Sequence, residues 1–424
     1  MSLRSCLSAL FLQLVLLSCA RGISLQVGDP RIRISTGFFH TCFHSTINEK
    51  LRCYGDNYFG QLGLGLNPGT KDVPSPFATV GDTSSELNSY FVSLSNSSYE
   101  VLDIAAGGYH TCVHIRGHET GVKCFGSNSR QWGQLGLGVE SSRVIGRHKA
   151  EMGENLKTVN MGTTAAIRKL VSGYAHTCVL LENHKVSCWG WNNYGQLGAG
   201  DRNNALIPAT IPEFLFSDIS LGKSHTCGIL KSQELLCWGN NDCGQVGVGE
   251  VGIHATPVTI EIPSLRVIEV SAGGSHTCVI TLDRVLKCWG NNLYGQIGTG
   301  TNQTKVLANE SIPIVFGDHR NVGVVHVAAG EDHTCALLAT GDVYCWGLNN
   351  DGQLGVGNLE KHAEPILVQL NGKASQVVAG RKHSCAVLLD SKIECWGSNR
   401  HAQLALGDKI DRLSPTEIPL SLFS

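Results

Sequence analysis

Histidine and cysteine recur together in this chain at a spacing that could support chemistry. In residues 176–200, HTCVLLENHKVSCWGWNNYGQLGAG, His176 stands two residues before Cys178, and Cys188 follows ten residues later. Such a set could form a metal site, a redox pair or a structural disulfide. The number of copies and the cellular compartment help to decide among these possibilities.

The stretch occurs seven times, and one histidine marks each copy. The intervals between these histidines are 70, 66, 49, 51, 57 and 50 residues, so the basic unit is near 50 residues, with insertions in three of the units. A period of this size is typical of propellers and solenoids. The copies centre on His40, His110, His176, His225, His276, His333 and His383.

Each copy can be read as four short strands. An alternating apolar segment precedes the histidine, the two cysteine segments form a hairpin, and a further apolar strand follows the GQLG sequence. Four strands make one propeller blade. We therefore expect an all-β, seven-bladed propeller. The last copy lacks the kind of strand that opens the first copy at residues 31–37, so we expect the N- and C-terminal strands to complete one blade together and close the ring.

The first 22 residues predict a compartment. One basic residue precedes an apolar run over Leu7–Leu17, and the small residues Ser18 and Ala20 follow it. This order is typical of a secretory signal peptide with its cleavage site. We expect a signal peptide over 1–22, a single propeller domain over 23–424 and a secreted protein. Lipid attachment at Cys19, giving a cell-surface anchor, is the alternative. No other stretch is long and apolar enough for a transmembrane segment.

Charge and motifs exclude several function classes. The chain carries 33 basic and 35 acidic residues, so no basic field favours nucleic acid or an anionic membrane. The sequence contains no G-x-S-x-G, G-x-x-x-x-G-K or H-E-x-x-H motif. We therefore expect no nucleic-acid partner, no catalytic residue, no metal and no cofactor.

The repeated sequences G-x-x-H-T-C, C-W-G-x-N and G-Q-L-G-x-G resemble the regulator of chromosome condensation repeat family, whose members are seven-bladed propellers. The resemblance covers nearly the whole chain beyond the signal peptide. Departures are confined to details, such as Tyr54 and Phe125 in place of the tryptophan and AQLALG in the last copy. The resemblance implies the fold and says less about function. Its nuclear members suggest guanine nucleotide exchange on a small GTPase.

Fourteen of the 17 cysteines fall into pairs within one copy. Partners equidistant from a hairpin turn face each other at about 4.5–5.5 Å between Cβ atoms, close to disulfide geometry. Zinc sites instead take ligands two to four residues apart, and secretory compartments oxidise thiols. We expect one disulfide in each blade: Cys42–Cys53, Cys112–Cys124, Cys178–Cys188, Cys227–Cys237, Cys278–Cys288, Cys335–Cys345 and Cys385–Cys395.

One cysteine of the mature chain has no partner in this scheme. Cys6 and Cys19 belong to the signal peptide, which leaves Cys243 as a free thiol. An unpaired cysteine in a secreted protein suggests a bridge between chains or an inert buried thiol. A disulfide-linked dimer through Cys243 is therefore one expectation.

Repetition in every copy favours structural roles for histidine and tryptophan. Each repeat histidine follows a glycine by three residues, so we expect the imidazole to sit at a strand start and to hydrogen-bond backbone in a tight turn. The tryptophans of C-W-G should pack one blade against the next. A catalytic role would single out one copy.

Candidate binding residues should break the repeat and lie on loops. The position before the GQ glycine is such a place, occupied by Phe59, Trp132, Tyr194, Cys243, Tyr294, Asp351 and Ala402. The four aromatic residues either cover the glycine turns of adjacent blades or form a partner-binding rim, and the rim is the functional hypothesis. The insertions near 66–100 and 139–168 are further candidates, or mobile decoration.

Three N-glycosylation sequences, at Asn96, Asn302 and Asn309, lie in segments between hairpins and fit a eukaryotic secretory route. Together these features predict a secreted or cell-surface, non-enzymatic binding scaffold that recognises an extracellular protein or glycan through one propeller face. Guanine nucleotide exchange is the alternative. A hydrolase or lyase with a channel site is weaker, because it would need a non-repeating acidic or histidine cluster on the axis.

Overall fold

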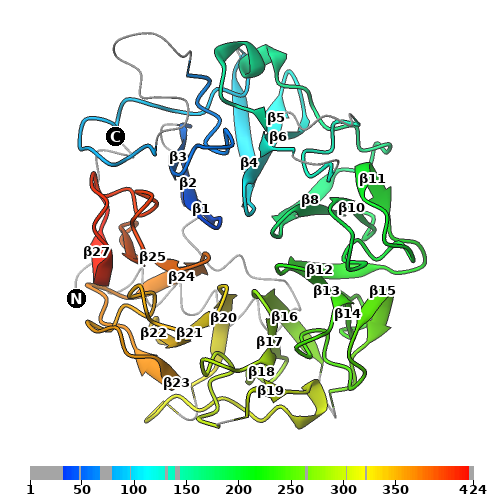
Figure 1. The fold of residues 1–424 in the computed structure, drawn as a ribbon, viewed down its shortest axis with the longest axis vertical. Coiled ribbons are helices and arrows are strands. Elements are labelled where there is room, and N and C mark those ends of the chain that lie inside the picture. Colours follow the sequence, from blue (N-terminus) through cyan, green and yellow to red (C-terminus); the bar gives the residue numbers. More distant parts are fainter. Residues whose placement is uncertain are drawn as a thin grey trace, which may run out of the picture.

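A computed structural model describes residues 32–46, 49–66, 79–95, 97–128, 132–138, 144–262, 266–301, 303–319 and 322–419. Within these ranges, seven antiparallel sheets are arranged around a central channel (Figure 1). Helical structure there is limited to three 3-10 turns, η2 (Lys149–Glu151), η3 (Gly153–Asn155) and η4 (Ala308–Glu310). The expected all-β, seven-bladed propeller is confirmed.

The blades are numbered 1 to 7 along the chain, and corresponding strands are given in that order. The inner strands are β1 (Ile32–Thr36), β4 (Tyr99–Ala106), β8 (Ile167–Ser172), β12 (Phe216–Leu221), β16 (Val267–Ala272), β20 (Val324–Ala329) and β24 (Ala374–Ala379). The second strands are β2 (His40–Ser45), β5 (His110–Gly117), β9 (His176–Leu181), β13 (His225–Leu230), β17 (His276–Thr281), β21 (His333–Leu338) and β25 (His383–Leu388). The third strands are β3 (Leu51–Gly55), β6 (Gly121–Ser127), β10 (Val186–Gly190), β14 (Leu235–Asn240), β18 (Leu286–Asn291), β22 (Val343–Gly347) and β26 (Ile393–Gly397). The outer strands of blades 2 to 7 are β7 (Val144–Ile145), β11 (Ala205–Thr210), β15 (Ile253–Thr259), β19 (Lys305–Val306), β23 (His362–Leu367) and β27 (Arg412–Glu417).

The cysteine hairpins have the register that the sequence predicts. In blade 3, for example, Cys178 lies directly opposite Cys188. All seven expected disulfides are present, each with 4.1 Å between its two Cα atoms. Each blade is therefore cross-linked between its second and third strands, and the metal reading of these cysteines is wrong.

The ring closes differently from our expectation. Blade 7 is made entirely of the consecutive strands β24–β27, and β1 pairs only with β2 of its own blade. The expectation of one blade shared by the two termini is wrong, because the strand before each histidine hairpin belongs to the same sheet as that hairpin. Blade 7 instead packs beside blade 1: the Arg381 amide donates to the Gly37 carbonyl (3.4 Å), and Thr41 Oγ1 lies 2.8 Å from His383 Nε2.

The insertions of blades 1 and 2 serve as structural cover in their described parts. Blade 1 has no described outer strand; its third strand instead forms a bridge between Gly55 and Val80. Tyr54 donates to the Leu87 carbonyl (2.5 Å). The fully buried ammonium of Lys123 donates to the Leu94 carbonyl at 2.8 Å. Further buried side chains of these segments include Val92, Met152, Leu156 and Val159.

The predicted signal peptide, including Cys6 and Cys19, lies outside the described residues, so its cleavage and the anchor alternative stay predictions. In the described ranges, the propeller strands extend from Ile32 to Glu417. No helix in that part of the chain is long and apolar enough to cross a membrane.

Candidate functional site

The repeat histidines connect neighbouring blades. Each imidazole Nε2 lies 2.8–3.1 Å from the hydroxyl that follows the histidine of the next blade, and the series runs once around the ring. We expected hydrogen bonds to backbone, and this detail is wrong. The structural role itself agrees with these contacts. The pairs are His40–Thr111, His110–Thr177, His176–Thr226, His225–Thr277, His276–Thr334, His333–Ser384 and His383–Thr41.

The partner hydroxyl fixes the direction of these bonds. Thr277, for example, donates to the Gln245 carbonyl at 2.7 Å, so its oxygen accepts the Nε2–H of His225. Trp289 Nε1 donates to the same carbonyl at 3.2 Å. One glutamine of the GQ loop therefore binds both the threonine and the tryptophan of the next blade, and the expected packing role of the tryptophans is confirmed.

Burial keeps the seven imidazoles neutral. Desolvation lowers the pKa of His225 to about 3 and that of His276 to about 4. Their rings have no exposed surface. A group that is neutral, enclosed and repeated in every blade cannot exchange protons with a substrate, so these histidines belong to the scaffold.

The GQ loops share one hydrogen bond in six of the seven blades. The residue before the glycine donates its amide to the glutamine side chain, as Tyr194 does to Gln196 at 3.0 Å. In the last blade, His401 makes this bond to Gln403 at 2.9 Å. Ala402 has φ of 60°, close to the glycines of the other loops, so it replaces the glycine. Our assignment of Ala402 to the variable position is wrong, and His401 is the equivalent residue.

These loops lie beside the G-x-x-H turns that connect inner and second strands. In blade 3, the Trp191 amide donates to the Ala175 carbonyl at 2.8 Å. In blade 1, the loop residue also meets the turn of the next blade: Phe59 contacts Tyr109 with 5.1 Å between ring centroids. Two variable positions of the repeat thus form one face of the propeller.

Three of the four predicted aromatic residues gather on this face in blades 1 to 3. The rings of Trp132 and Trp191 lie 5.5 Å apart, and Tyr194 lies 5.3 Å from Trp191. Trp132 also meets Tyr174 at 6.4 Å, and Tyr174 meets Tyr109 at 5.8 Å. We call this continuous, half-buried set the aromatic cluster: Phe38, Phe39, Phe59, Tyr109, Trp132, Tyr174, Trp191 and Tyr194.

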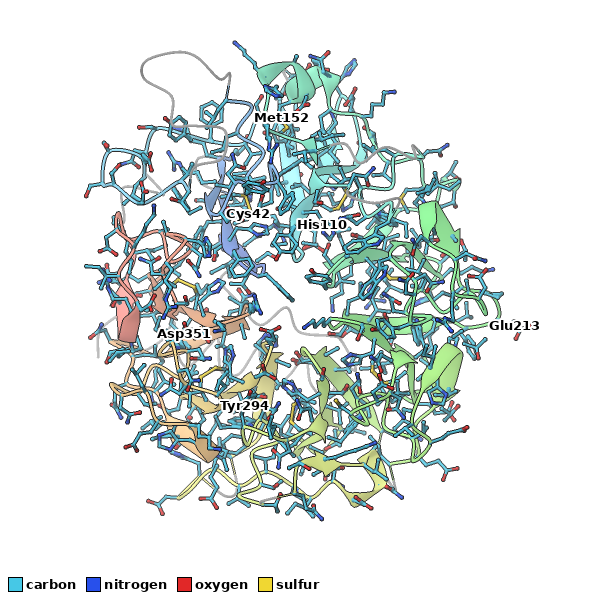
Figure 2. All side chains as sticks on the ribbon, in the orientation of Figure 1. Cys42, His110, Met152, Glu213, Tyr294 and Asp351 are labelled. Carbon is cyan, nitrogen blue, oxygen red and sulfur yellow. A yellow bond between two sulfur atoms is a disulfide. The ribbon has the colours of Figure 1, made fainter. Side chains whose placement is uncertain are left out.

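Tyr294 does not join the aromatic cluster. Figure 2 shows it in the half of the ring opposite His110 and Cys42. In the described part of the chain its ring contacts no other aromatic ring. Its loop instead meets an acidic turn, where Gln296 donates to Asp332 at 3.3 Å. The hypothesis of a rim formed by four aromatic residues therefore reduces to three residues in three adjacent blades.

Sequence reasoning missed five members of the aromatic cluster. Phe38, Phe39, Tyr109 and Tyr174 occupy the two positions between the repeat glycine and histidine, and Trp191 follows C-W-G. A comparison of these positions across the seven copies could have found them, because blades 4 to 7 carry KS, GS, ED and RK there. The face is therefore aromatic on one side and largely charged on the other.

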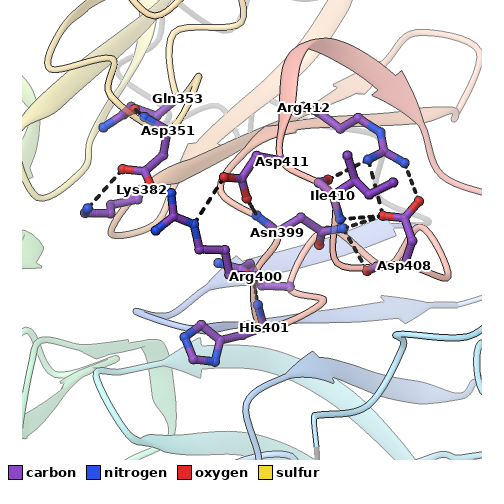
Figure 3. Close-up of polar contacts among 11 residues, drawn as sticks. Asp351, Gln353, Lys382, Asn399, Arg400, His401, Asp408, Ile410, Asp411 and Arg412 are labelled. Carbon is purple, nitrogen blue, oxygen red and sulfur yellow. Dashed lines mark hydrogen bonds and ion pairs between the residues drawn. The ribbon is translucent and has the colours of Figure 1, made fainter.

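The charged residues on the other side of this face form ion pairs with one another. Figure 3 shows Asp351, at the loop position equivalent to Phe59, accepting from Lys382 of the next blade at 2.9 Å. Arg400 lies 3.4 Å from Asp351 and 3.3 Å from Asp411. His401 turns to the aromatic side and meets the Phe39 ring at 4.8 Å. The charged residues thus form a rigid border to the aromatic cluster.

The channel contains a second set of non-repeating residues, seven positions before each repeat histidine. A cavity of about 610 Å³ is lined there by Asp103, Lys169, Asp218, Glu269 and His326. These groups bind one another or the next blade. Lys169 Nζ lies 2.6 Å from Asp218, and His326 Nδ1 lies 2.7 Å from Glu269. Asp103 accepts the Leu170 amide at 2.8 Å.

The pKa shifts of the channel residues follow from these ion pairs and from burial. The Lys169 and His326 pKa values are raised by their carboxylate partners despite opposing desolvation, whereas burial raises the pKa of Asp103. The channel lining does contain the acidic and histidine side chains that a channel enzyme would need. Its groups are engaged in contacts between blades, and no group of three potential metal-ligating side chains occurs within the described ranges.

The remaining predicted sites are the free thiol and the three glycosylation sequences. Cys243 is half-buried and has no disulfide partner among the described residues; burial is the largest cause that raises its pKa. Asn309 is exposed in η4. Asn96 and Asn302 lie outside the described residues. Glycosylation at all three and a dimer through Cys243 stay predictions.

Known proteins support the family assignment. The ultraviolet-B receptor UVR8 of Arabidopsis thaliana is 29% identical over 352 residues, covering 82% of this chain and 72% of its own length. The X-linked retinitis pigmentosa GTPase regulator of Mus musculus is 33% identical over 348 residues, covering 79% of this chain; the chain spans only 29% of that protein. The crystal structure of human WBSCR16 superposes with a TM-score of 0.70 at 22% identity, covering 85% of this chain and 88% of that one. That likeness supports the fold alone.

Two models of the regulator of chromosome condensation (RCC1) repeat match this chain. The first matches residues 167–196, 216–245, 267–296, 324–353 and 374–403. The second matches residues 183–229, 233–280, 288–337 and 340–387. Each match contains the glycine-histidine turns, the cysteine hairpins or the GQ loops described above, and together they span more than half of the sequence. The chain belongs to the regulator of chromosome condensation (RCC1) repeat family.

Proposed function

We propose that this protein is a secreted, non-enzymatic scaffold that binds an extracellular protein on the face carrying the aromatic cluster. The observation that carries the proposal is the continuity of eight half-buried rings across three adjacent blades. Aromatic side chains dominate the energetics of protein interfaces, and contiguous apolar surface marks interaction sites. The alternative that these rings only cover glycine turns does not require rings in three blades to meet.

Secretion has separate support. The N-terminal sequence, the three glycosylation sequences and seven disulfides all fit an oxidising compartment. Reducing compartments keep such thiols reduced. Guanine nucleotide exchange remains the alternative, since one relative is named a GTPase regulator. Stimulated GDP release from a small GTPase by the purified chain would support that alternative.

The binding test compares two aromatic positions of the same repeat. A double variant, Trp132→Ala with Tyr194→Ala, should capture at least ten-fold less of a protein partner from extracellular fluid than the wild type does. Tyr294→Ala is the matched control, because it has the same loop position outside the aromatic cluster, and it should capture the partner normally.

Correct folding is checked by the thermal midpoint, which should agree among the three proteins within a few degrees because the changed rings are half-buried. Equal capture by the wild type and the double variant would remove the proposed face. Capture of a glycan in place of a protein, with the same dependence on the two rings, would change the class of partner.

A further inference from the structure

A small cavity lies where the aromatic and charged sides of the face meet at the channel mouth. It measures about 110 Å³. Its floor consists largely of glycines from the G-x-x-H turns. We call this cavity the mouth pocket; its side-chain walls include Phe38, Tyr174, Lys223, Glu331 and Arg381.

One wall of the mouth pocket is apolar. The rings of Phe38 and Tyr174 belong to the aromatic cluster and lie 5.0 Å apart. They can cover the hydrocarbon part of a side chain that enters the pocket. The charged side chains of the lining are two cations and one carboxylate, Lys223, Arg381 and Glu331, whose formal charges sum to +1.

Arg381 is held in place while part of its guanidinium stays unused. Its Nε lies 2.5 Å from Glu331 Oε2, and its Cζ lies 5.1 Å from the Phe39 ring and 5.5 Å from the Phe38 ring. Neither terminal nitrogen of this guanidinium has a hydrogen-bond partner in the described ranges. A planar guanidinium fixed in this way is pre-organised to bind a carboxylate through its terminal nitrogens.

Lys223 supplies a second donor on the same side. Its ammonium lies 3.3 Å from the other oxygen of Glu331, and its side chain is 45% exposed. Glu331 is only 11% exposed and divides its charge between the two cations. A further carboxylate would therefore complete the pairing of this wall.

We propose that the mouth pocket receives an aspartate or glutamate side chain of the protein partner, bound between Lys223 and the terminal nitrogens of Arg381. The aliphatic part of that residue packs on Phe38 and Tyr174. This inference rests on the proposed function and names the chemistry of the partner at one point. A sulfated glycan fits less well, because the nearby cations Lys382 and Arg400 are already paired with Asp351.

The test uses a probe that does not depend on the partner. Binding of 3-phenylpropionate to the purified secreted protein is measured by ligand-observed NMR and compared with 3-phenylpropionamide, which has the same ring and no charge. The carboxylate should bind at least five-fold more tightly. Arg381→Met and Lys223→Met should each remove most of this preference, and Lys382→Met should retain it.

Equal binding of acid and amide, binding of neither, or a preference that survives both variants would overturn the inference. So would displacement of 3-phenylpropionate by a heparin tetrasaccharide, because a sulfated glycan would then occupy the mouth pocket. The two proposals can fail separately. If Arg381→Met and Lys223→Met capture the partner normally while the Trp132 and Tyr194 variant does not, the binding face stands and the mouth-pocket inference falls.

Discussion

The seven repeat histidines are buried and neutral, and their role is to connect neighbouring blades. Each connects its blade to the next through a hydroxyl, as His225 does to Thr277 at 2.9 Å. That hydroxyl donates in turn to the Gln245 carbonyl. The histidines of a pattern that could have formed a metal site therefore belong to a ring of hydrogen bonds that joins all seven blades.

The low pKa of these histidines predicts a pH-dependent stability. The folded-state pKa of His225, about 3, lies below the ordinary value of 6.5. The unfolded chain therefore binds more protons between these values, and stability is lost as pH falls below about 6.5. One such histidine contributes a loss of about 2 kcal/mol between pH 7 and pH 5.

A His225→Gln variant should accordingly lose about 2 kcal/mol less than the wild type between pH 7 and pH 5. At pH 7 it should be less stable by about 1–3 kcal/mol, because a buried hydrogen bond is disturbed. Urea unfolding at the two pH values measures both quantities. His254→Gln, in the outer strand β15, is the control. An identical pH dependence of His225→Gln and wild type would contradict the role of the buried imidazole.

Among the elements, the cysteine hairpin is the unit that the sequence specifies best. Its length and its two equidistant cysteines predict the register, and the structure has Cys178 opposite Cys188 and Cys335 opposite Cys345. Each disulfide joins two strands of a single blade. Its effect on stability should therefore be confined to that blade.

Removing the Cys178–Cys188 bridge by a double alanine change should lower the free energy of unfolding by about 2–3 kcal/mol. The Cys335–Cys345 bridge, which closes a loop of the same length, should have a similar effect. Since the two lie in separate blades, the combined variant should show the sum within about 0.5 kcal/mol. Denaturant unfolding gives the three values, and a strongly non-additive result would contradict independent cross-linking of the blades.

Contacts between neighbouring blades could not be predicted from the sequence. Seven copies of one pattern are enough to predict the number of blades and the strand order within each. They do not show which side chains become neighbours across two blades. Phe59 meets Tyr109 because a loop of one blade contacts the turn of the next. Tyr294 occupies the same repeat position, but the next turn carries Glu331 and Asp332.

The same limits explain two of the structural errors, the ring closure and the assignment of Ala402. Ring closure depends on where a sheet begins relative to the repeat, and sequence periodicity does not define that point. Ala402 was assigned to the wrong position because alanine replaced the glycine that marks the loop. Its positive φ identifies it as the glycine substitute.

For the whole molecule, the predicted compartment and the proposed function are consistent with each other. Seven disulfides, an apolar N-terminal segment and three glycosylation sequences form one consistent argument for secretion. The face that we propose for binding is asymmetric: it is aromatic in blades 1 to 3 and charged in blades 4, 6 and 7.

Secretion can be tested directly with the full chain expressed in mammalian cells. We expect the protein in the medium, with its N-terminus near residue 21 to 23 after signal cleavage. Treatment with an N-glycosidase should increase its electrophoretic mobility, and an Asn309→Gln variant should show a smaller shift. Retention in the nucleus or cytosol with free thiols would contradict secretion and would favour the nucleotide-exchange alternative.

Hydroxyl-radical footprinting of the complex with the captured partner tests whether the aromatic cluster is the binding face. The predicted result is protection of the peptides containing Phe59, Trp132 and Tyr194 on complex formation, with the Tyr294 peptide oxidised equally in free and bound protein. Protection of the Tyr294 peptide, with unchanged oxidation of the other three, would contradict the account.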